Sequence, residues 1–216
     1  MIVGDAAGED QAMANRTLTL MQAALVLAWL TPPAALGLTP VAARAAGGLL
    51  DCSYATDASS EVASHPDCAA ITPAGALRLA PHTLDHLRFD DDGLASVQVG
   101  NLFFYVDEKG RTAPVAGVDG HAVGFNNDLA PSPRHVGGGY KIGYIDRQLN
   151  LAIPARWDGG LDFSGGRAEV CRGCHVARDG DFAELQGGLW GCIDTSGHEV
   201  VPVNQSSPDG LDCAGQ

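Results

Sequence analysis

The chain has few aromatic residues and few positive charges for its length of 216 residues. Only four Tyr and six Phe stand against 28 Gly and 12 Pro, a composition typical of a β-rich protein with many turns. Lys and Arg number 13 and Asp and Glu 26, so the formal net charge is −13. Because nucleic acids and anionic membrane surfaces repel an acidic protein, we expect neither as a partner.

The sequence also lacks the short motifs of common enzyme classes. It contains no G-x-S-x-G nucleophile motif, no P-loop and no dinucleotide-binding fingerprint, and spacing singles out no pair of carboxylates. Its hydrophobic fraction of 45% is nevertheless that of a globular protein with a buried core. We therefore expect a folded all-β protein that is not an enzyme and uses no cofactor.

Residues 1–45 have the parts of a secretory signal peptide. Arg16 precedes an apolar run over residues 18–30, which is too short to span a bilayer and is followed by Pro32. Ala43 and Ala45 fit the small-residue cleavage pattern, so we expect cleavage after Ala45.

The mature chain is accordingly expected in the bacterial periplasm or outside the cell, with no stable membrane span after signal cleavage. A signal peptide begins with a positively charged segment, which the acidic residues before Met13 do not suit. Met13 is therefore an alternative start to Met1. A lipoprotein is excluded, because Asp51 stands before Cys52 where lipidation needs a small residue.

Three segments of the mature chain share one pattern, at residues 89–115, 125–154 and 163–203. Each begins with a polar turn and an alternating segment, and alternation with period two is typical of a strand with two different faces. A second strand, rich in aromatic and β-branched residues, ends at Asp107, Asp146 or Asp194. A turn follows, and a third strand closes the unit at a proline, which we expect to end the pairing.

The third segment resembles a unit of the bacterial WG-repeat family, in which an F-S-E-G-L-A segment leads to W-G-Y-I-D, a turn and I-P-P. Here Phe163-Ser164-Gly165-Gly166-Arg167-Ala168 leads to Trp190-Gly191-Cys192-Ile193-Asp194 and then to Val200-Val201-Pro202. The second segment has Ile142-Gly143 in place of Trp-Gly, and the first has Phe103-Phe104. The resemblance covers about residues 84–203. It implies tandem three-stranded hairpin units in an open curved array or a propeller-like arrangement, and no shared active site.

On this reading, residues 46–83 form an N-terminal segment or divergent cap unit, residues 84–203 about three repeats, and residues 204–216 a C-terminal tail. End units of a stack need such caps because they have a neighbour on one side only. Within the repeat, Trp190 is expected in the core, and Gly191 is expected to let the indole ring lie across the backbone.

The connection between the first and second strands of a unit lengthens along the chain. The repeated alanine and the repeated aspartate are 12, 16 and 26 residues apart in the three units. Because binding residues tend to lie on loops carried by a repeat scaffold, we expect the longest connection, residues 171–186, to contact an unknown protein or cell-envelope partner.

Six cysteines follow the expected cleavage site, and an even number in an exported protein indicates disulfides. Sequence alone leaves fifteen connectivities open. Proximity along the chain favours the pairs Cys52–Cys68, Cys171–Cys174 and Cys192–Cys213.

Cys171, Cys174 and His175 also satisfy the C-x-x-C-H pattern of covalent c-type haem attachment. Against haem, the last methionine is Met21, so the mature chain has no Met to serve as second axial ligand. Zinc binding with Cys192 is a second alternative, although adjacent Cys174 and His175 do not readily aim at one ion. A thiol oxidoreductase is a third, but it needs a helix after the motif, and nothing there is helical in pattern.

Overall fold

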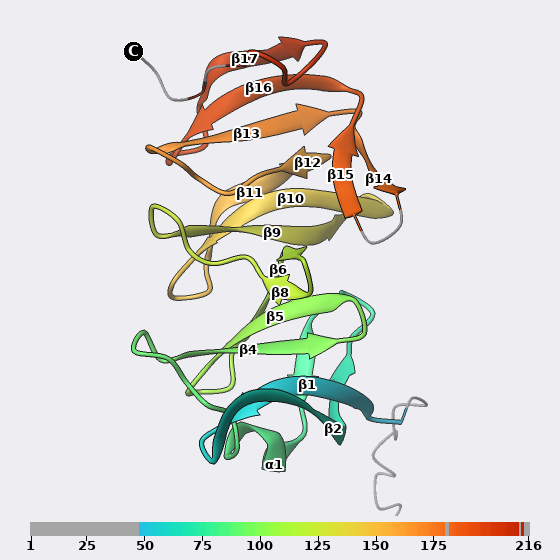
Figure 1. Ribbon diagram of the computed structural model, residues 1–216, viewed down its shortest axis with the longest axis vertical. Coiled ribbons are helices and arrows are strands. Elements are labelled where there is room, and N and C mark those ends of the chain that lie inside the picture. The colour runs from blue at the N-terminus through green and yellow to red at the C-terminus, as the bar shows by residue number, and fades with distance from the viewer. Residues whose placement is uncertain (1–47, 180–181, 212, 214–216) are drawn as a thin grey trace, which may run out of the picture. The chain divides into compact units, whose positions relative to one another are not determined.

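The structure is a computed structural model that describes residues 48–179, 182–211 and 213 (Figure 1). Within these residues it contains seventeen strands and one short helix, α1 (Pro81–Leu84), which confirms the predicted all-β class. No helix in this part of the chain is long and apolar enough to cross a membrane. The expected signal peptide, residues 1–45, lies outside the described residues.

The first repeat unit shares one sheet with the segment that precedes it. The strands of this six-stranded sheet lie in the order β3-β2-β1-β4-β5-β6. The repeat supplies β4 (Leu94–Val99), β5 (Leu102–Asp107) and β6 (Thr112–Val115), and the preceding segment supplies β1 (Leu50–Thr56), β2 (Ser59–Ile71) and β3 (Leu77–Leu79). The Cys52–Cys68 disulfide joins β1 to β2.

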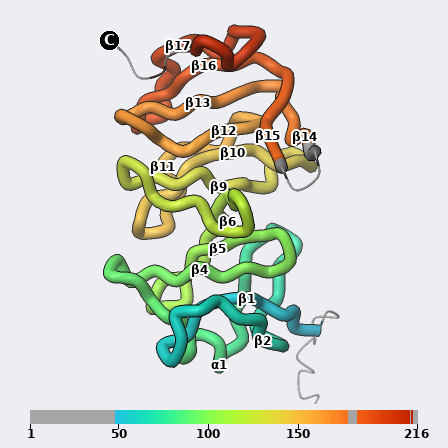
Figure 2. The backbone as a smooth tube through the Cα atoms, viewed as in Figure 1, coloured from blue at the N-terminus to red at the C-terminus, as the bar shows by residue number. Residues whose placement is uncertain are grey.

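The second unit is a separate three-stranded antiparallel sheet of order β11-β10-β9, drawn in olive and yellow in Figure 2. Its strands are β9 (Leu129–Val136), β10 (Gly139–Asp146) and β11 (Leu151–Trp157). A small hairpin of β7 (Gly117–Val118) and β8 (His121–Ala122) precedes it in the chain.

The third unit carries an inserted hairpin. Its sheet has the order β12-β13-β16-β17, with strands β12 (Gly159–Gly160), β13 (Arg167–Arg172), β16 (Leu189–Asp194) and β17 (Glu199–Gln205). Between β13 and β16 the chain leaves this sheet and forms a two-stranded hairpin of β14 (His175–Asp179) and β15 (Phe182–Gln186). The longest predicted connection is thus itself a β-hairpin.

Neighbouring units share their cores, as expected for tandem repeats. One buried cluster joins Phe103 and Val115 of the first unit to Ala130 and Ile145 of the second. A larger cluster joins the second unit to the third, and its members are Leu129, Tyr144, Ile153, Trp157, Phe163, Ala168, Val170, Ile193 and Val203. Each unit therefore depends on its neighbour to cover its apolar face.

The repeated aspartate organises the turn between the second and third strands. Asp107 Oδ1 accepts hydrogen bonds from the backbone N–H groups of residues 109 and 111, and Asp194 Oδ1 accepts them from residues 196 and 198. Gly110 and Gly197 have φ of 75° and 80°, as the turn requires. In the second unit Leu149 takes the corresponding place, with a φ of 61° that is unfavourable for a branched side chain.

Two expectations about the repeat unit are wrong. The strands do not end at proline: β11 continues three residues beyond Pro154, and β17 three beyond Pro202. Their pairing with β10 and β16 is interrupted by register shifts, so the missing proline N–H falls in an irregular stretch. Nor does Gly191 make room for the indole ring, because a Cβ there would meet the backbone of Val201 and Val203.

Candidate binding groove

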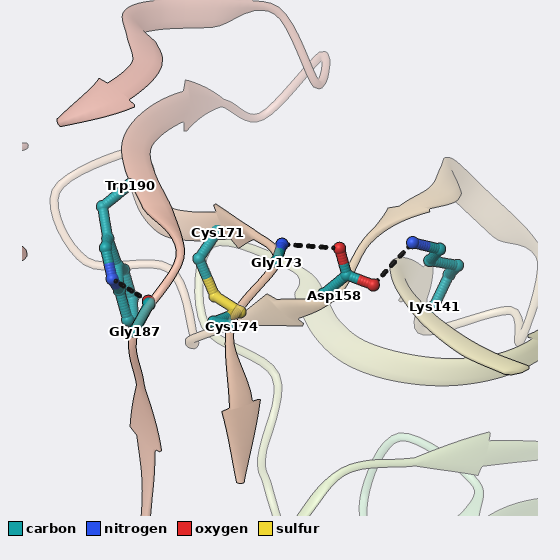
Figure 3. The surroundings of a disulfide bond; sticks show 7 residues. All are labelled: Lys141, Asp158, Cys171, Gly173, Cys174, Gly187 and Trp190. Carbon is teal, nitrogen blue, oxygen red and sulfur yellow. Dashed lines mark hydrogen bonds and ion pairs between the residues drawn. A yellow bond between two sulfur atoms is a disulfide. The ribbon is translucent and has the colours of Figure 1, made fainter. Parts of the chain in front are cut away.

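The β14–β15 hairpin is fixed at its base by a disulfide. Cys171 lies near the end of β13 and Cys174 precedes β14, and the two are joined (Figure 3). The hairpin opens directly after this bond, where His175 pairs with Gln186. The bond thus ties the point where the hairpin leaves the sheet of the third unit.

Asp158 connects the base of the hairpin to the second unit. Its Oδ2 accepts a hydrogen bond of 2.9 Å from the Gly173 N–H, and its Oδ1 forms an ion pair of 2.5 Å with Lys141 Nζ on β10 (Figure 3). These two interactions, the backbone hydrogen bond first, outweigh partial burial and lower the pKa of the Asp158 carboxyl. The carboxylate therefore orients the turn between the two cysteines.

Trp190 holds the other end of the hairpin. Only 2% of this residue is exposed, and its indole N–H donates a 2.8 Å hydrogen bond to the Gly187 carbonyl oxygen, just after β15 (Figure 3). Trp190, Cys171 and Cys174 form a small core cluster that Leu185 and Leu211 pack against. The tryptophan of the repeat motif is thus a core residue that supports the hairpin.

A groove of about 550 Å³ lies beside the hairpin. Its lining comes from the hairpin, from β7, β9, β10, β12, β13 and β16, and from segments that connect them. Its apolar lining consists of Ala116, Val118, Val123, Pro131, Ile142, Leu161, Val176, Ala183, Leu185, Trp190 and Pro208. The groove is within the usual size range of ligand pockets.

The polar side chains that line the groove are carboxylates. They belong to Asp158, Asp162, Glu169 and Glu184, and none of the described residues that line the groove is Lys or Arg. Three of the four have partners: Asp158 binds Lys141, Asp162 accepts a hydrogen bond from Asn126, and Glu184 accepts one from Gln186.

Glu169 differs from the other three. Among the described residues its carboxylate has no hydrogen-bond or ion-pair partner, and burial raises its pKa. Its place in the sheet explains the burial, since Glu169 pairs with Cys192 and lies on the same face of β13 as Cys171, which pairs with Trp190. The described side chains thus place a partly buried carboxylate in the groove and supply no counter-charge to it.

The predicted cysteine pairs are those in the structure: Cys52–Cys68, Cys171–Cys174 and Cys192–Cys213. Haem attachment or zinc binding would need both sulfur atoms that the Cys171–Cys174 bond uses. His175 is exposed at the start of β14. Within the part of the chain that is described, no three His, Cys, Asp or Glu side chains gather to hold a metal ion.

Sequence reasoning did not single out Glu169, Asp158 or Lys141. A signal for Glu169 exists, because it interrupts the apolar run Ala168-Glu169-Val170 at the position that alternation assigns to the opposite face. Asp158, between β11 and β12, is 17 residues from Lys141 on β10, and no local pattern links them.

Residues 142–173 match the family model described as "WG containing repeat". The match begins at Ile142-Gly143, where the second unit has its counterpart of Trp-Gly, and ends within the third unit at the base of the hairpin. No curated protein and no solved structure shows significant similarity to the chain. The match and the three hairpin units support the assignment of this region to the WG-repeat family.

Proposed function

We propose that the mature chain is an exported, non-catalytic repeat protein that binds a protein of the bacterial envelope. Its contact surface is the β14–β15 hairpin together with the groove beside it. The observation that carries this proposal is the fastening of an inserted hairpin at its base by a disulfide, by Asp158 and by Trp190. A loop that serves only as a connection does not need to be held in this way.

Export is supported by the leader pattern in residues 1–45 and by the three disulfides. Disulfides form and persist in the periplasm and outside the cell, whereas the cytoplasm keeps thiols reduced. Both observations are compatible with a periplasmic or secreted protein.

Binding is supported by the form of the hairpin. Val176 is 57% exposed, and Ala183 and Glu184 are exposed on the other strand, so the hairpin presents a mixed apolar and acidic surface. Such a surface on a fixed support has little conformational freedom left to lose on binding, which favours affinity.

The proposal is tested by shortening the hairpin in the full chain. Residues 176–185 are replaced by Asn-Gly, a two-residue turn that keeps His175 next to Gln186 and leaves the Cys171–Cys174 disulfide in place. The tagged wild-type and shortened proteins are exported in the native host, and the proteins that co-purify from the envelope are compared by mass spectrometry.

We expect a specific partner to be recovered with the wild-type chain and lost with the shortened one, while the far-ultraviolet circular dichroism of the two proteins stays alike. An unchanged set of co-purifying proteins would contradict the proposed contact surface. A wild-type chain that remains in the cytoplasm would contradict export.

A further inference from the structure

We infer that a cleft between the first and second units binds one sugar ring of a cell-envelope glycan, which stacks on Tyr140. This Tyr140 cleft has a volume of about 160 Å³. Its lining comes from β2, β5, β6, β7, β9 and β10 and from segments that connect them. No described residue of β14 or β15 lines it, and it meets the hairpin groove only at Ala116 and Gly117. A ligand here is therefore independent of the partner proposed for the hairpin.

Tyr140 gives the cleft an exposed aromatic face. The residue lines the cleft and is 59% exposed. Its ring lies edge-on to the His135 ring, with the two centroids 5.1 Å apart and 71° between the planes. The strands that carry the two rings, β9 and β10, pair without interruption as far as the turn at Gly137 and Gly138. The aromatic ring is therefore held in place before a ligand arrives, which lowers the entropic cost of binding.

The rest of the aromatic lining is buried. Phe103 and Phe104 line the cleft from β5, and both belong to the core. Gly117 lies directly against the Phe103 ring, because a Cβ on this glycine would overlap the ring. A sugar ring has C–H groups on its two faces, which the face of an aromatic ring attracts and an apolar surface accepts. The aromatic residues of the cleft thus suit the faces of a sugar ring.

Polar side chains at the cleft suit the edge of such a ring. Asn101 is exposed in the turn between β4 and β5, where Gln98 Nε2 donates a 2.8 Å hydrogen bond to the Gly100 carbonyl oxygen. Arg134 lines the cleft from β9 and is half-buried. An amide offers two donors and an acceptor, and a guanidinium group offers five donors, so both can pair with neighbouring hydroxyl groups. None of the described residues that line the cleft is Asp or Glu.

The size and lining of the cleft favour a sugar over other ligands. Its volume is below the roughly 300–1,000 Å³ of pockets for drug-sized molecules, so it holds about one ring. A purely apolar group would remove water from Asn101 and Arg134 without replacing the lost hydrogen bonds. A small inorganic anion would leave the exposed face of Tyr140 without a contact. Because Asn101 and Tyr140 are exposed, the remainder of a glycan can extend from the cleft into solvent.

Two neutral tetrasaccharides serve as probes, one of β-1,4-linked N-acetylglucosamine and one of α-1,4-linked glucose. Their binding to the full mature protein is measured by chemical-shift perturbation. We expect at least one of them to bind with a Kd of about 0.1–1 mM and to shift signals of residues that line the cleft. The preferred probe distinguishes an amino-sugar glycan of the cell wall from a glucose polymer.

Three variants separate stacking from general effects on the fold. Tyr140→Ala should weaken binding about tenfold, because it removes the aromatic face, whereas Tyr140→Phe keeps the ring and should stay within about threefold of wild type. Val136→Ala is the matched control, since Val136 is an exposed apolar residue beside the same turn and does not line the cleft. This control should change affinity by less than about twofold.

No binding of either tetrasaccharide at about 10 mM would overturn the inference. Equal weakening by Tyr140→Ala and Val136→Ala would also overturn it, because the ring would then have no particular role. Sulfate that binds more tightly than both sugars would identify an anion site at Arg134 instead. If Tyr140→Ala loses a protein partner in the host and neither sugar binds, the cleft is a protein contact.

The shortened hairpin distinguishes this inference from the proposed function. The protein with residues 176–185 replaced by Asn-Gly should bind the tetrasaccharide as tightly as the wild type, because no described hairpin residue lines the cleft. Loss of the protein partner in that variant, with sugar binding unchanged, would support both assignments. Loss of sugar binding in that variant would contradict the placement of the sugar at Tyr140.

Discussion

Gly191 and Val201 lie so close across β16 and β17 that a Cβ on the glycine would be 2.6 Å from the Val201 carbonyl oxygen. Gly143 has the same relationship to Ile153, at 2.5 Å. In both units the partner strand shifts register at this point and passes through a proline. The first unit has Phe104 instead, and there β5 pairs with β6 without interruption. The glycine of the motif therefore marks a bulge in the third strand.

Gly143→Ala should destabilise the fold by about 2–3 kcal/mol, because the added methyl group meets backbone atoms that cannot rotate away. Gly139→Ala, in the same strand, has nothing within 4 Å of its new Cβ and should change stability by less than about 0.5 kcal/mol. Urea denaturation of both variants measures the difference. Equal effects would show that the glycine is not needed for the close approach of the strands.

The disulfides should differ in their contribution to stability. Cys171–Cys174 closes a sequence separation of 3 and Cys192–Cys213 one of 21, so loop-closure entropy predicts stabilisation of about 2 and about 3 kcal/mol. Replacing both cysteines of a pair by alanine tests each bond, with unfolding followed in urea. The variant without Cys192–Cys213 should be the less stable of the two, and the reverse order would contradict the entropic account.

Asp158 should make stability depend on pH in the acid range. Its pKa is lowered in the folded protein, so its contribution is complete above the ordinary carboxyl pKa of about 3.9 and is lost as pH falls toward the lower folded value. Asp158→Asn should be less stable than wild type at pH 7, and this difference should shrink below about pH 4. A difference that stays constant between pH 7 and pH 3 would show that the charge of the Asp158 carboxylate contributes nothing to stability.

Most of the fold could be predicted from the sequence because each hairpin unit depends on residues that are close together in the chain. Asp107, Asp146 and Asp194 end their strands as predicted, since an aspartate that binds the backbone ahead of it needs only its neighbours. The extension of β17 beyond Pro202 was not predictable from proline alone, because a bulge in the pairing accommodates it. The groove could not be predicted from the sequence for another reason. It forms where segments more than 60 residues apart in the chain meet, and no periodic pattern indicates which distant segments come together.

The expected signal-peptide cleavage and the three disulfides together predict the intact mass of the exported protein. The exported protein should begin at Ala46 and be lighter by six hydrogens than the fully reduced chain, because three disulfides remove two hydrogens each. Intact mass under non-reducing conditions, from a host that matures c-type cytochromes, measures both features. An added haem mass would instead establish attachment at Cys171 and Cys174 and contradict the proposed role.

The central claim is that the hairpin is the contact surface, and site-specific photo-crosslinking tests it most directly. A photoreactive phenylalanine is placed at Val176 on β14 or, as the control, at Val62 on β2, since these valines are 57% and 60% exposed. Both proteins are irradiated in living cells of the native host. We expect one discrete adduct from position 176 and none from position 62. No adduct at either position, or the same adduct at both, would contradict the assignment of the hairpin as the contact surface.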